Sequence, residues 1–244
     1  MQNIKSETTG QKHISTLAED IKSLISGISE GKSLNMTDEN MDVFLKNIKE
    51  AMLAWNTPRV RPDKEGQLRM SSIGKPSRQL WYDKHSPKHR KDEDAGMNLK
   101  FLYGHIIEHL VLYLAELAGH KVEDQQRKVE VEGVSGHIDS IIDGEICDVK
   151  SASSFSFKKF KSGEIVGDDP FGYHAQLAGY EAGCGTKEGG FLVVDKSNGD
   201  ICFYKPDDMA KPNVKQLITD LRVSLEQDTP PEKCYPFKEE KNGN

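Results

Sequence analysis

Two aspartates and a lysine are spaced so that a β-hairpin would bring their side chains into one site. Asp143-Gly144, a dipeptide typical of a two-residue hairpin turn, separates Asp139 from Asp148 and Lys150. Pairing outward from this turn places Asp139 opposite Asp148, Lys150 on the same face, and His137 opposite Lys150. Two carboxylates at that separation repel each other unless a cation lies between them. The spacing predicts a metal-binding hairpin, and a charge-balanced exposed hairpin remains the alternative.

Oxygen ligands favour hard cations, so the predicted ion is Mg²⁺ or Mn²⁺. Such an ion polarises a phosphoryl oxygen and makes hydroxide available from bound water near neutral pH. Lys150 would orient or deprotonate the attacking water, or stabilise the charge that develops on the phosphate. This combination of residue types indicates phosphodiester hydrolysis.

A third carboxylate, Glu108, lies within a strongly apolar segment that is predicted to be a helix. Burying a carboxylate is costly unless it is paired or bound to a metal, which favours a ligand role. The alternative is that Glu108 lies on an exposed stripe beside His105 and His109. The residues alone leave both interpretations open.

Gln176 and Tyr180 are four residues apart on a predicted helix, and they share one face with Tyr173. An amide and a phenol at these positions could contact phosphate, a nucleobase or Lys150. A core helix with no role in chemistry is the alternative.

Charge and composition narrow the class of protein. The 244-residue chain has a formal net charge of -6, which argues against a protein that coats nucleic acid by bulk charge. The four cysteines form no C-x-x-C pair, so neither a zinc ribbon nor a disulfide framework is predicted. Because no long apolar run or signal-like start is present, we expect a soluble, cytoplasmic protein that does not insert into a membrane.

The predicted elements form a mixed α/β fold, with a central mixed β-sheet flanked by helices. Residues 1–57 are predicted to be a helical N-terminal appendage, residues 58–230 the core, and residues 231–244 a loosely ordered tail. The appendage could serve oligomerisation, binding of a protein partner or DNA threading. Within the core the predicted order is helix, three strands, helix, two strands, helix, and its main segments are 97–117, 121–131, 134–142, 145–150, 169–183, 190–195, 200–205 and 207–226.

A basic stretch from Lys84 to Lys91 stands out against the acidic composition of the chain. Its lysine, arginine and histidine residues predict a phosphate-binding surface, and a solvated loop is the alternative.

Four short motifs in order resemble the RecB-like branch of the PD-(D/E)XK nuclease superfamily, which includes phage exonucleases. They are G-x-x-x-E at 104–108, G-x-x-D at 136–139, D-x-K at 148–150 and Q-x-x-x-Y at 176–180. The resemblance covers roughly residues 71–205. It implies a restriction-endonuclease-like core and a metal-dependent DNA nuclease.

Carried onto this chain, the resemblance makes Glu108, Asp139 and Asp148 metal ligands, with the Val149 carbonyl as a further one. It makes Lys150 the catalytic lysine, and it assigns substrate contact and support of the active site to Gln176 and Tyr180.

Upstream, the segment 71–82 resembles the opening segment of iron–sulfur members of this branch, but Pro76 replaces its cysteine. We therefore expect no iron–sulfur cluster. The resemblance also implies DNA contacts, by Tyr180 and by four residues of this segment: Ser71, Ser72, Arg78 and Tyr82.

The hypothesis from sequence is an exonuclease that acts on DNA ends in phage-type replication, recombination or DNA degradation. An exonuclease is favoured because the resemblance is to end-processing enzymes and no separate recognition domain is evident. The alternatives are a structure- or sequence-specific endonuclease, and a catalytically silent nuclease fold that binds DNA or a host nuclease. A homo-oligomer is a further alternative for the N-terminal helices.

Overall fold

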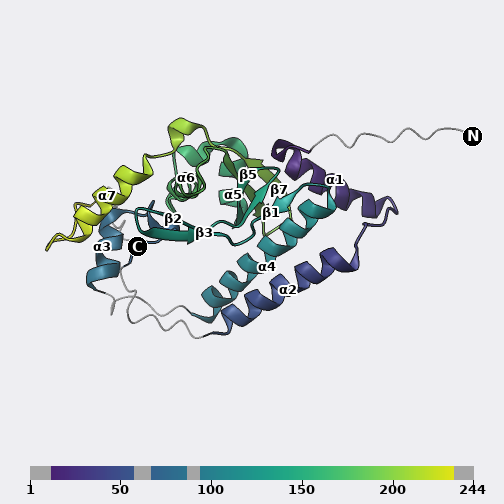
Figure 1. Ribbon diagram of the computed structural model, residues 1–244, viewed down its shortest axis with the longest axis horizontal. Helices are drawn as coiled ribbons and strands as arrows, with labels where there is room; N and C mark the ends of the chain where they lie inside the picture. Colours follow the sequence, from purple (N-terminus) through teal and green to yellow (C-terminus); the bar gives the residue numbers. More distant parts are fainter. Residues whose placement is uncertain (1–11, 58–66, 87–93, 234–244) are drawn as a thin grey trace, which may run out of the picture.

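The chain folds as a mixed α/β structure, and the computed structural model describes residues 12–57, 67–86 and 94–233. The predicted fold class, a central mixed sheet flanked by helices, is confirmed (Figure 1). The helices are α1 (Leu17–Ser29), α2 (Asp38–Trp55), α3 (Ser77–His85), α4 (Ala95–Leu117), α5 (Ser154–Ser162), α6 (Tyr173–Cys184) and α7 (Val214–Leu225), with 3₁₀ turns η1 (Ile14–Thr16), η2 (Met70–Ser72), η4 (Glu164–Val166) and η5 (Asp208–Ala210). The strands are β1 (Val122–Glu123), β2 (Lys128–Val131), β3 (Val134–His137), β4 (Ser140–Ile142), β5 (Glu145–Ala152), β6 (Gly189–Asp195) and β7 (Ile201–Tyr204).

The main sheet has the strand order β1-β4-β5-β6-β7, and β5 and β6 are parallel while the other pairs are antiparallel. The predicted turn between β4 and β5 is confirmed, because Asp143 and Gly144 both have positive φ, 52° and 91°. Its register is also as predicted, with Ser140 opposite Cys147 and Ile142 opposite Glu145. The hairpin therefore aligns the start of β4 with the middle of β5.

The predicted strands 121–131 and 134–142 are each divided in two. β1 and β4 belong to the main sheet, whereas β2 and β3 pair in a separate two-stranded sheet. The prediction that His137 faces Lys150 is wrong, because His137 pairs with Lys128. The chain leaves β3 after His137: the Ile138 amide donates to the Arg127 carbonyl at 3.0 Å, and the Ile138 side chain is buried. Apolar and polar residues keep alternating where the chain passes from β3 to β4. The sequence pattern therefore does not reveal that the chain changes sheet.

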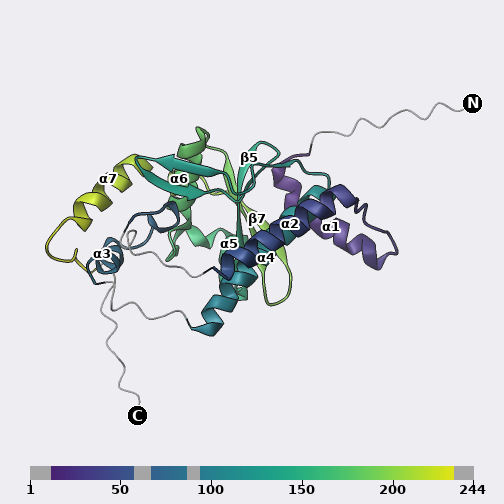
Figure 2. The same ribbon diagram turned by 60° about the horizontal axis from the view of Figure 1, so that its bottom comes forward.

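Two hydrophobic clusters cover opposite faces of the main sheet, because successive β5 side chains point to alternate faces. Ile146 belongs to the first cluster, with residues of α5, α6, α7 and η2, and Cys147 belongs to the second, with residues of α1 and α4. Figures 1 and 2 show α2 alongside α4, with α3 and α7 together at the far end of the molecule from α1. Because residues of α1 belong to the second cluster, this helix packs on the main sheet as part of its hydrophobic core.

A buried histidine joins α1 to the turn between β4 and β5. His120 Nδ1 lies 2.6 Å from Asp143 Oδ2, and His120 Nε2 lies 3.1 Å from Asp20 Oδ2. The other oxygen of Asp143 accepts from the Lys121 amide at 2.9 Å. These contacts fix the turn that sets the β4–β5 register.

Several element boundaries differ from the sequence-based expectation. Neither α3 nor α5 is among the segments predicted above, and the helix predicted within residues 169–183 begins at Tyr173. Thr37 caps α2, since its side chain accepts from the Asn40 amide. None of the helices in the described part of the chain combines the length and apolar character needed to cross a membrane.

The basic stretch lies partly outside the described residues, which stop at Ser86 and resume at Asp94. Its described members bind the end of α7: Lys84 donates to the Leu225 carbonyl and pairs with Glu226, and His85 Nε2 lies 2.9 Å from the Leu225 carbonyl oxygen. The predicted phosphate contacts at Lys88, Arg90 and Lys91 fall outside the described residues.

The segment before α3 touches the loop before α6 through two glycines. A Cβ built on Gly74 would lie 2.4 Å from the Gly172 Cα, and one built on Gly172 would lie 2.3 Å from the Gly74 Cα. Gly172 also has a φ of +74°, which other residues rarely adopt. The backbones therefore approach closely only because both side chains are absent.

We predict that Gly74→Ala destabilises the fold, because its Cβ can be accommodated only by moving backbone. Such overpacking typically costs about 1–3 kcal/mol. For a chain of this size each kcal/mol lowers the melting temperature by roughly 2–4 °C. Thermal denaturation followed by circular dichroism measures the change. The matched control is Gly167→Ala, whose Cβ would meet the Glu164 carbonyl oxygen at an ordinary 3.8 Å. Equal melting temperatures for the two variants would contradict the prediction.

Candidate active site

β5 carries an aspartate and a lysine on the same face of the sheet, two residues apart. Lys150 Nζ lies 2.5 Å from Asp148 Oδ2. The Asp148 side chain is 1% exposed and that of Lys150 is 17% exposed. The structure thus places a close ion pair in the middle of the central strand, almost out of reach of water.

The Asp148 carboxylate is only partly satisfied. Its Oδ2 is engaged by the Lys150 ammonium, whereas its buried Oδ1 has no hydrogen-bond partner among residues 12–57, 67–86 and 94–233. A buried carboxylate oxygen without a donor is costly. This carboxylate is therefore suited to receive a cation.

Asp139 lies in the crossing between β3 and β4, next to the middle of β5. Its Oδ2 accepts from the Val149 backbone N–H at 2.7 Å. The N–H and C=O of one strand residue point to the same side. The Val149 carbonyl therefore also points toward the side where Asp139 lies, as a metal ligand at Val149 would require.

Glu108 is buried on α4 and is 8% exposed, so the exposed-stripe alternative for this residue is excluded. Its Oε1 accepts from Gln126 Nε2 at 2.6 Å, and its Oε2 lies 3.9 Å from His105 Nδ1. The structure therefore turns this carboxylate inward, with one oxygen already engaged.

Charge repulsion connects the three carboxylates. Burial raises the pKa of Asp139 well above its usual range, and the charges of Asp148 and Glu108 raise it further. Burial also raises the pKa of Asp148, against the opposing effect of Lys150. Asp139, Asp148 and Glu108 thus form one electrostatic group in which a bound cation would relieve the repulsion.

Lys150 is held as an ammonium. Burial alone would lower its pKa, but the charges of Asp148 and Asp139 outweigh burial and raise that pKa above its usual value. Lys150 Nζ also donates to Gln176 Oε1 at 3.2 Å and lies 4.9 Å from the centre of the Tyr173 ring. In the structure described, this side chain donates hydrogen bonds.

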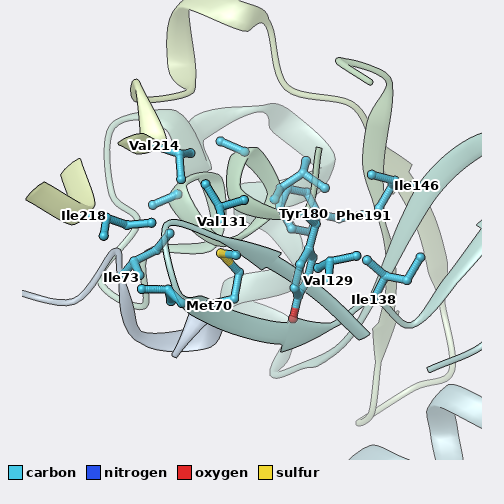
Figure 3. Packing of buried hydrophobic residues seen from close by; sticks show 14 of the residues in the cluster. Met70, Ile73, Val129, Val131, Ile138, Ile146, Tyr180, Phe191, Val214 and Ile218 are labelled. Carbon is cyan, nitrogen blue, oxygen red and sulfur yellow. The ribbon is translucent and has the colours of Figure 1, made fainter. Parts of the chain in front are cut away.

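Gln176 and Tyr180 continue the hydrogen-bond chain from Lys150 into the core. Gln176 Nε2 donates to the Tyr180 hydroxyl at 2.9 Å, and Figure 3 shows Tyr180 between Met70 and Val129. Tyr180 is 4% exposed, which leaves little surface for a DNA contact. Burial raises the pKa of Tyr180, so its hydroxyl stays protonated.

Gly136 makes this packing possible. A Cβ at this position would lie 2.5 Å from the Met70 Cβ and 2.9 Å from the Tyr180 Cε1. The glycine of the G-x-x-D motif is therefore explained by contact with the aromatic ring that supports Gln176.

The upstream candidates do not join the carboxylate group. Ser72 Oγ donates to the Arg69 carbonyl at 2.9 Å, and Ser71 is exposed. Arg78 donates to the Pro231 carbonyl at 2.5 Å and to the Tyr82 hydroxyl at 3.2 Å. Figures 1 and 2 show α3 beside α7 and away from β5. A DNA contact by these residues stays a prediction.

Asp139, Asp148 and Glu108 interact electrostatically but do not form a complete metal-binding site. Across residues 12–57, 67–86 and 94–233, no three His, Cys, Asp or Glu side chains are arranged to hold a metal ion. The hydrogen bonds of Asp139 with Val149 and of Glu108 with Gln126 account for part of this arrangement. Each of these two carboxylates has one oxygen in a hydrogen bond and a second oxygen outside that bond.

Two residues at the site were not identified as partners from sequence. Gln126, which donates to Glu108, lies in a turn with a positive φ of 57°, and no spacing rule links it to a helix residue. Tyr173 was placed on the correct helix face, but the position of its ring beside the Lys150 ammonium depends on how α6 packs on the sheet.

No family model and no curated protein sequence matches the chain. Its structure is similar to that of an alkaline exonuclease (LHK-Exo) from Laribacter hongkongensis, with a TM-score of 0.42, 15% identity, and coverage of 73% of this chain and 94% of that chain. LHK-Exo in complex with dAMP gives a TM-score of 0.41, 16% identity, and coverage of 67% and 91%. A structure named SSO0001 gives a TM-score of 0.40, 18% identity, and coverage of 78% and 87%. Similarity at this level carries no inference about activity, so the function depends on the chemistry of this chain's own side chains.

Asp169 fixes the start of α6, the helix that carries Gln176. Its Oδ1 accepts from the Tyr173 amide at 3.0 Å, and its Oδ2 accepts from the His174 amide and from His174 Nδ1, both at 2.9 Å. Burial opposes the charge of Asp169, but the hydrogen bonds from His174 and Tyr173 outweigh burial and lower its pKa. The carboxylate therefore accepts from the first two backbone amides of α6, which begins at Tyr173 within the predicted segment 169–183.

We predict that Asp169→Asn destabilises the protein at neutral pH and that this difference shrinks in acid. A carboxylate whose pKa is lowered on folding contributes stability above its unfolded pKa, about 3.9, and loses it as pH falls through the folded pKa. Loss of a capping group costs about 1 kcal/mol, so the melting temperature should fall by roughly 2–4 °C at pH 7. Melts from pH 7 to pH 3 test this, with Asp228→Asn on the exposed surface as the control. A gap that stays constant down to pH 3 would refute the assignment.

Proposed function

We propose that this chain is a divalent-metal-dependent deoxyribonuclease that hydrolyses phosphodiester bonds, and that it acts as an exonuclease on DNA ends. The observation that carries this proposal is the buried Asp148 carboxylate, whose Oδ1 has no hydrogen-bond donor within the described residues. Asp139 and Glu108 repel one another and Asp148 across the same small region, and Lys150 provides the adjacent positive charge. Such a group of oxygen donors fits Mg²⁺ or Mn²⁺.

Asp148, Asp139, Glu108 and the Val149 carbonyl are the residues that would hold the ion. When bound, a divalent cation polarises a phosphoryl oxygen and lowers the pKa of bound water. The charges of Asp148 and Asp139 raise the pKa of Lys150, which suits it to donate to a phosphate oxygen and stabilise negative charge that develops there. Of the roles considered from sequence, this favours charge stabilisation by Lys150 over removal of a proton from water.

Gln176 and Tyr180 position Lys150. The amide oxygen of Gln176 accepts from the ammonium, while its nitrogen donates to the Tyr180 hydroxyl, which orients the amide. Both residues act in this proposal through Lys150. Direct DNA contacts by Ser71, Ser72, Arg78 and Tyr82 remain part of the proposal on the sequence resemblance alone.

DNA as substrate, attack at ends, and a setting in phage-type replication, recombination or DNA degradation are inferred from the order of the four motifs. The second candidate function is a nuclease fold that binds DNA or a host nuclease without cutting. It is favoured by the finding that no three His, Cys, Asp or Glu side chains among the described residues are arranged to hold a metal ion. Metal binding and cleavage separate the two candidates.

We predict that the protein cleaves DNA with Mg²⁺ or Mn²⁺ and that Asp148→Asn and Lys150→Ala each lower the rate by at least about a hundredfold. This is the scale expected when one group that stabilises charge in the transition state is lost. Time courses with 5′- and 3′-labelled DNA measure the rate. Stepwise release from one end identifies an exonuclease, whereas internal products identify an endonuclease.

The control for these variants is Asp228→Asn, which should cut at the rate of the parent protein. The proposed function is lost if the parent is inert on single-stranded, blunt and 5′-phosphorylated duplex ends with both metals. It is equally lost if Asp148→Asn and Lys150→Ala cut as fast as the parent.

We predict that excess Mn²⁺ raises the melting temperature of the parent protein and has little effect on Asp148→Asn. A ligand at 100 times its Kd stabilises the folded state by about 2.7 kcal/mol. For a chain of this length that corresponds to a rise of roughly 5 °C or more. Differential scanning fluorimetry with and without Mn²⁺ measures the shift. An equal shift in both proteins would mean that the ion binds elsewhere.

A further inference from the structure

An exposed phenylalanine stands beside the candidate active site on a well-fixed loop. Phe171 is 56% exposed, although aromatic side chains normally lose much of their surface on folding. The next residue, Gly172, is in backbone contact with Gly74, and the Asp169 carboxylate accepts from the first amides of α6. The loop is therefore held on both sides of Phe171, and its exposure is part of the fold.

A continuous aromatic surface joins Phe171 to the active-site ammonium. The Phe171 and Tyr173 ring centres are 5.4 Å apart with an interplanar angle of 30°, and Lys150 Nζ lies 4.9 Å from the Tyr173 ring centre. The distance from Phe171 to Lys150 Nζ is at most the sum of these two distances. A nucleotide next to a phosphate held at Lys150 is therefore within reach of Phe171.

The neighbouring helix α5 adds lysine side chains and a second exposed ring. It follows directly after β5 and contains no acidic residue and three lysines, Lys158, Lys159 and Lys161, of which Lys161 pairs with Asp200. Phe155 is 70% exposed, with Lys159 Nζ 4.5 Å from its ring centre. Lys159 also pairs with Asp168, which places α5 beside the loop of Phe171. Exposed aromatic rings next to lysines are the combination that holds single-stranded nucleic acid without reading its sequence.

We propose that Phe171 is a stacking surface for an unpaired nucleobase of the DNA strand whose phosphate lies at Lys150. This inference rests on the proposed nuclease function and specifies its substrate class. A base inside a duplex is already stacked on both faces, so only a single strand, or a strand separated at a duplex end, presents a free face to Phe171. The stacking is tolerant of sequence, because every base has an aromatic face.

The test measures binding of a short DNA strand with hydrolysis-resistant phosphorothioate linkages, in Mn²⁺, to the full-length protein. The strand carries the fluorescent base 2-aminopurine at its 5′ end or its 3′ end, and a matched strand has an abasic position instead. The proteins are the parent, Phe171→Ala, Phe171→Trp and a control, Val223→Ala, whose side chain is 59% exposed on the distant helix α7. Melting temperatures check that each variant is folded.

For the parent we expect fluorescence quenching at one end of the strand, and a Kd that rises about fivefold or more when that base is removed. Phe171→Ala should lose the quenching and bind both strands with the weaker affinity, while Phe171→Trp and Val223→Ala keep it. The inference is overturned if Phe171→Ala binds and quenches like the parent, as it would if Phe171 instead served a protein partner.

Cleavage of unmodified DNA by the same proteins separates this result from the proposed function. If the parent cuts and Phe171→Ala has the parent's KM on single strands, the nuclease stands and the stacking inference fails. If the parent does not cut but shows the quenching that Phe171→Ala lacks, the stacking surface stands and the proposed hydrolysis fails.

Discussion

The interaction that the rest of the site depends on is the contact of the Lys150 ammonium with a carboxylate that water barely reaches. Asp148 and Lys150 lie 2.5 Å apart on the central strand. Removing two charges from water costs several kcal/mol for each ion, so the surrounding structure has to compensate. The Gln176 amide accepts from Lys150, the Val149 amide donates to Asp139, and Gln126 donates to Glu108. Each of these hydrogen bonds engages one polar atom or one N–H of a charged side chain. The remaining charge still interacts with the other charged groups of the site.

The sheet explains why these groups meet. β5 is hydrogen-bonded to β4 on one side and to the parallel strand β6 on the other, so its backbone has little freedom to shift. Alternation along β5 sends Cys147 and Val149 toward α1 and α4 and leaves Asp148 and Lys150 on the face of α6. Because β4 begins only at Ser140, the Val149 amide is available to the Asp139 side chain instead of to another strand. The end of one short strand thus creates the position of a carboxylate.

Sequence reasoning identified the hairpin turn, its register and the residues that gather around β5, because turn chemistry and strand alternation are local rules. It failed where the outcome depended on tertiary packing. At Ile138 the chain passes from the two-stranded sheet to the main sheet while apolar and polar residues keep alternating. His137 was therefore predicted to face Lys150, whereas it pairs with Lys128. The helix α5 has phenylalanines at 155, 157 and 160 that combine strand-like and helix-like spacing, and only burial of Phe157 and Phe160 decides between them. The partner of Glu108 comes from a turn whose sequence has no signal for it.

The paired glycines before α3 and α6 also limit how this chain could change over time. Compensating exchanges are common in protein cores, where one residue grows as its neighbour shrinks. Gly74 and Gly172 cannot compensate for each other in this way, because each already has the smallest side chain and each would strike the other's main chain. Drift at either position therefore requires the two loops to separate first, and that movement would carry Phe171 and the start of α6 away from Lys150. Sequences descended from this one should retain the two glycines together or lose the present arrangement of the loops.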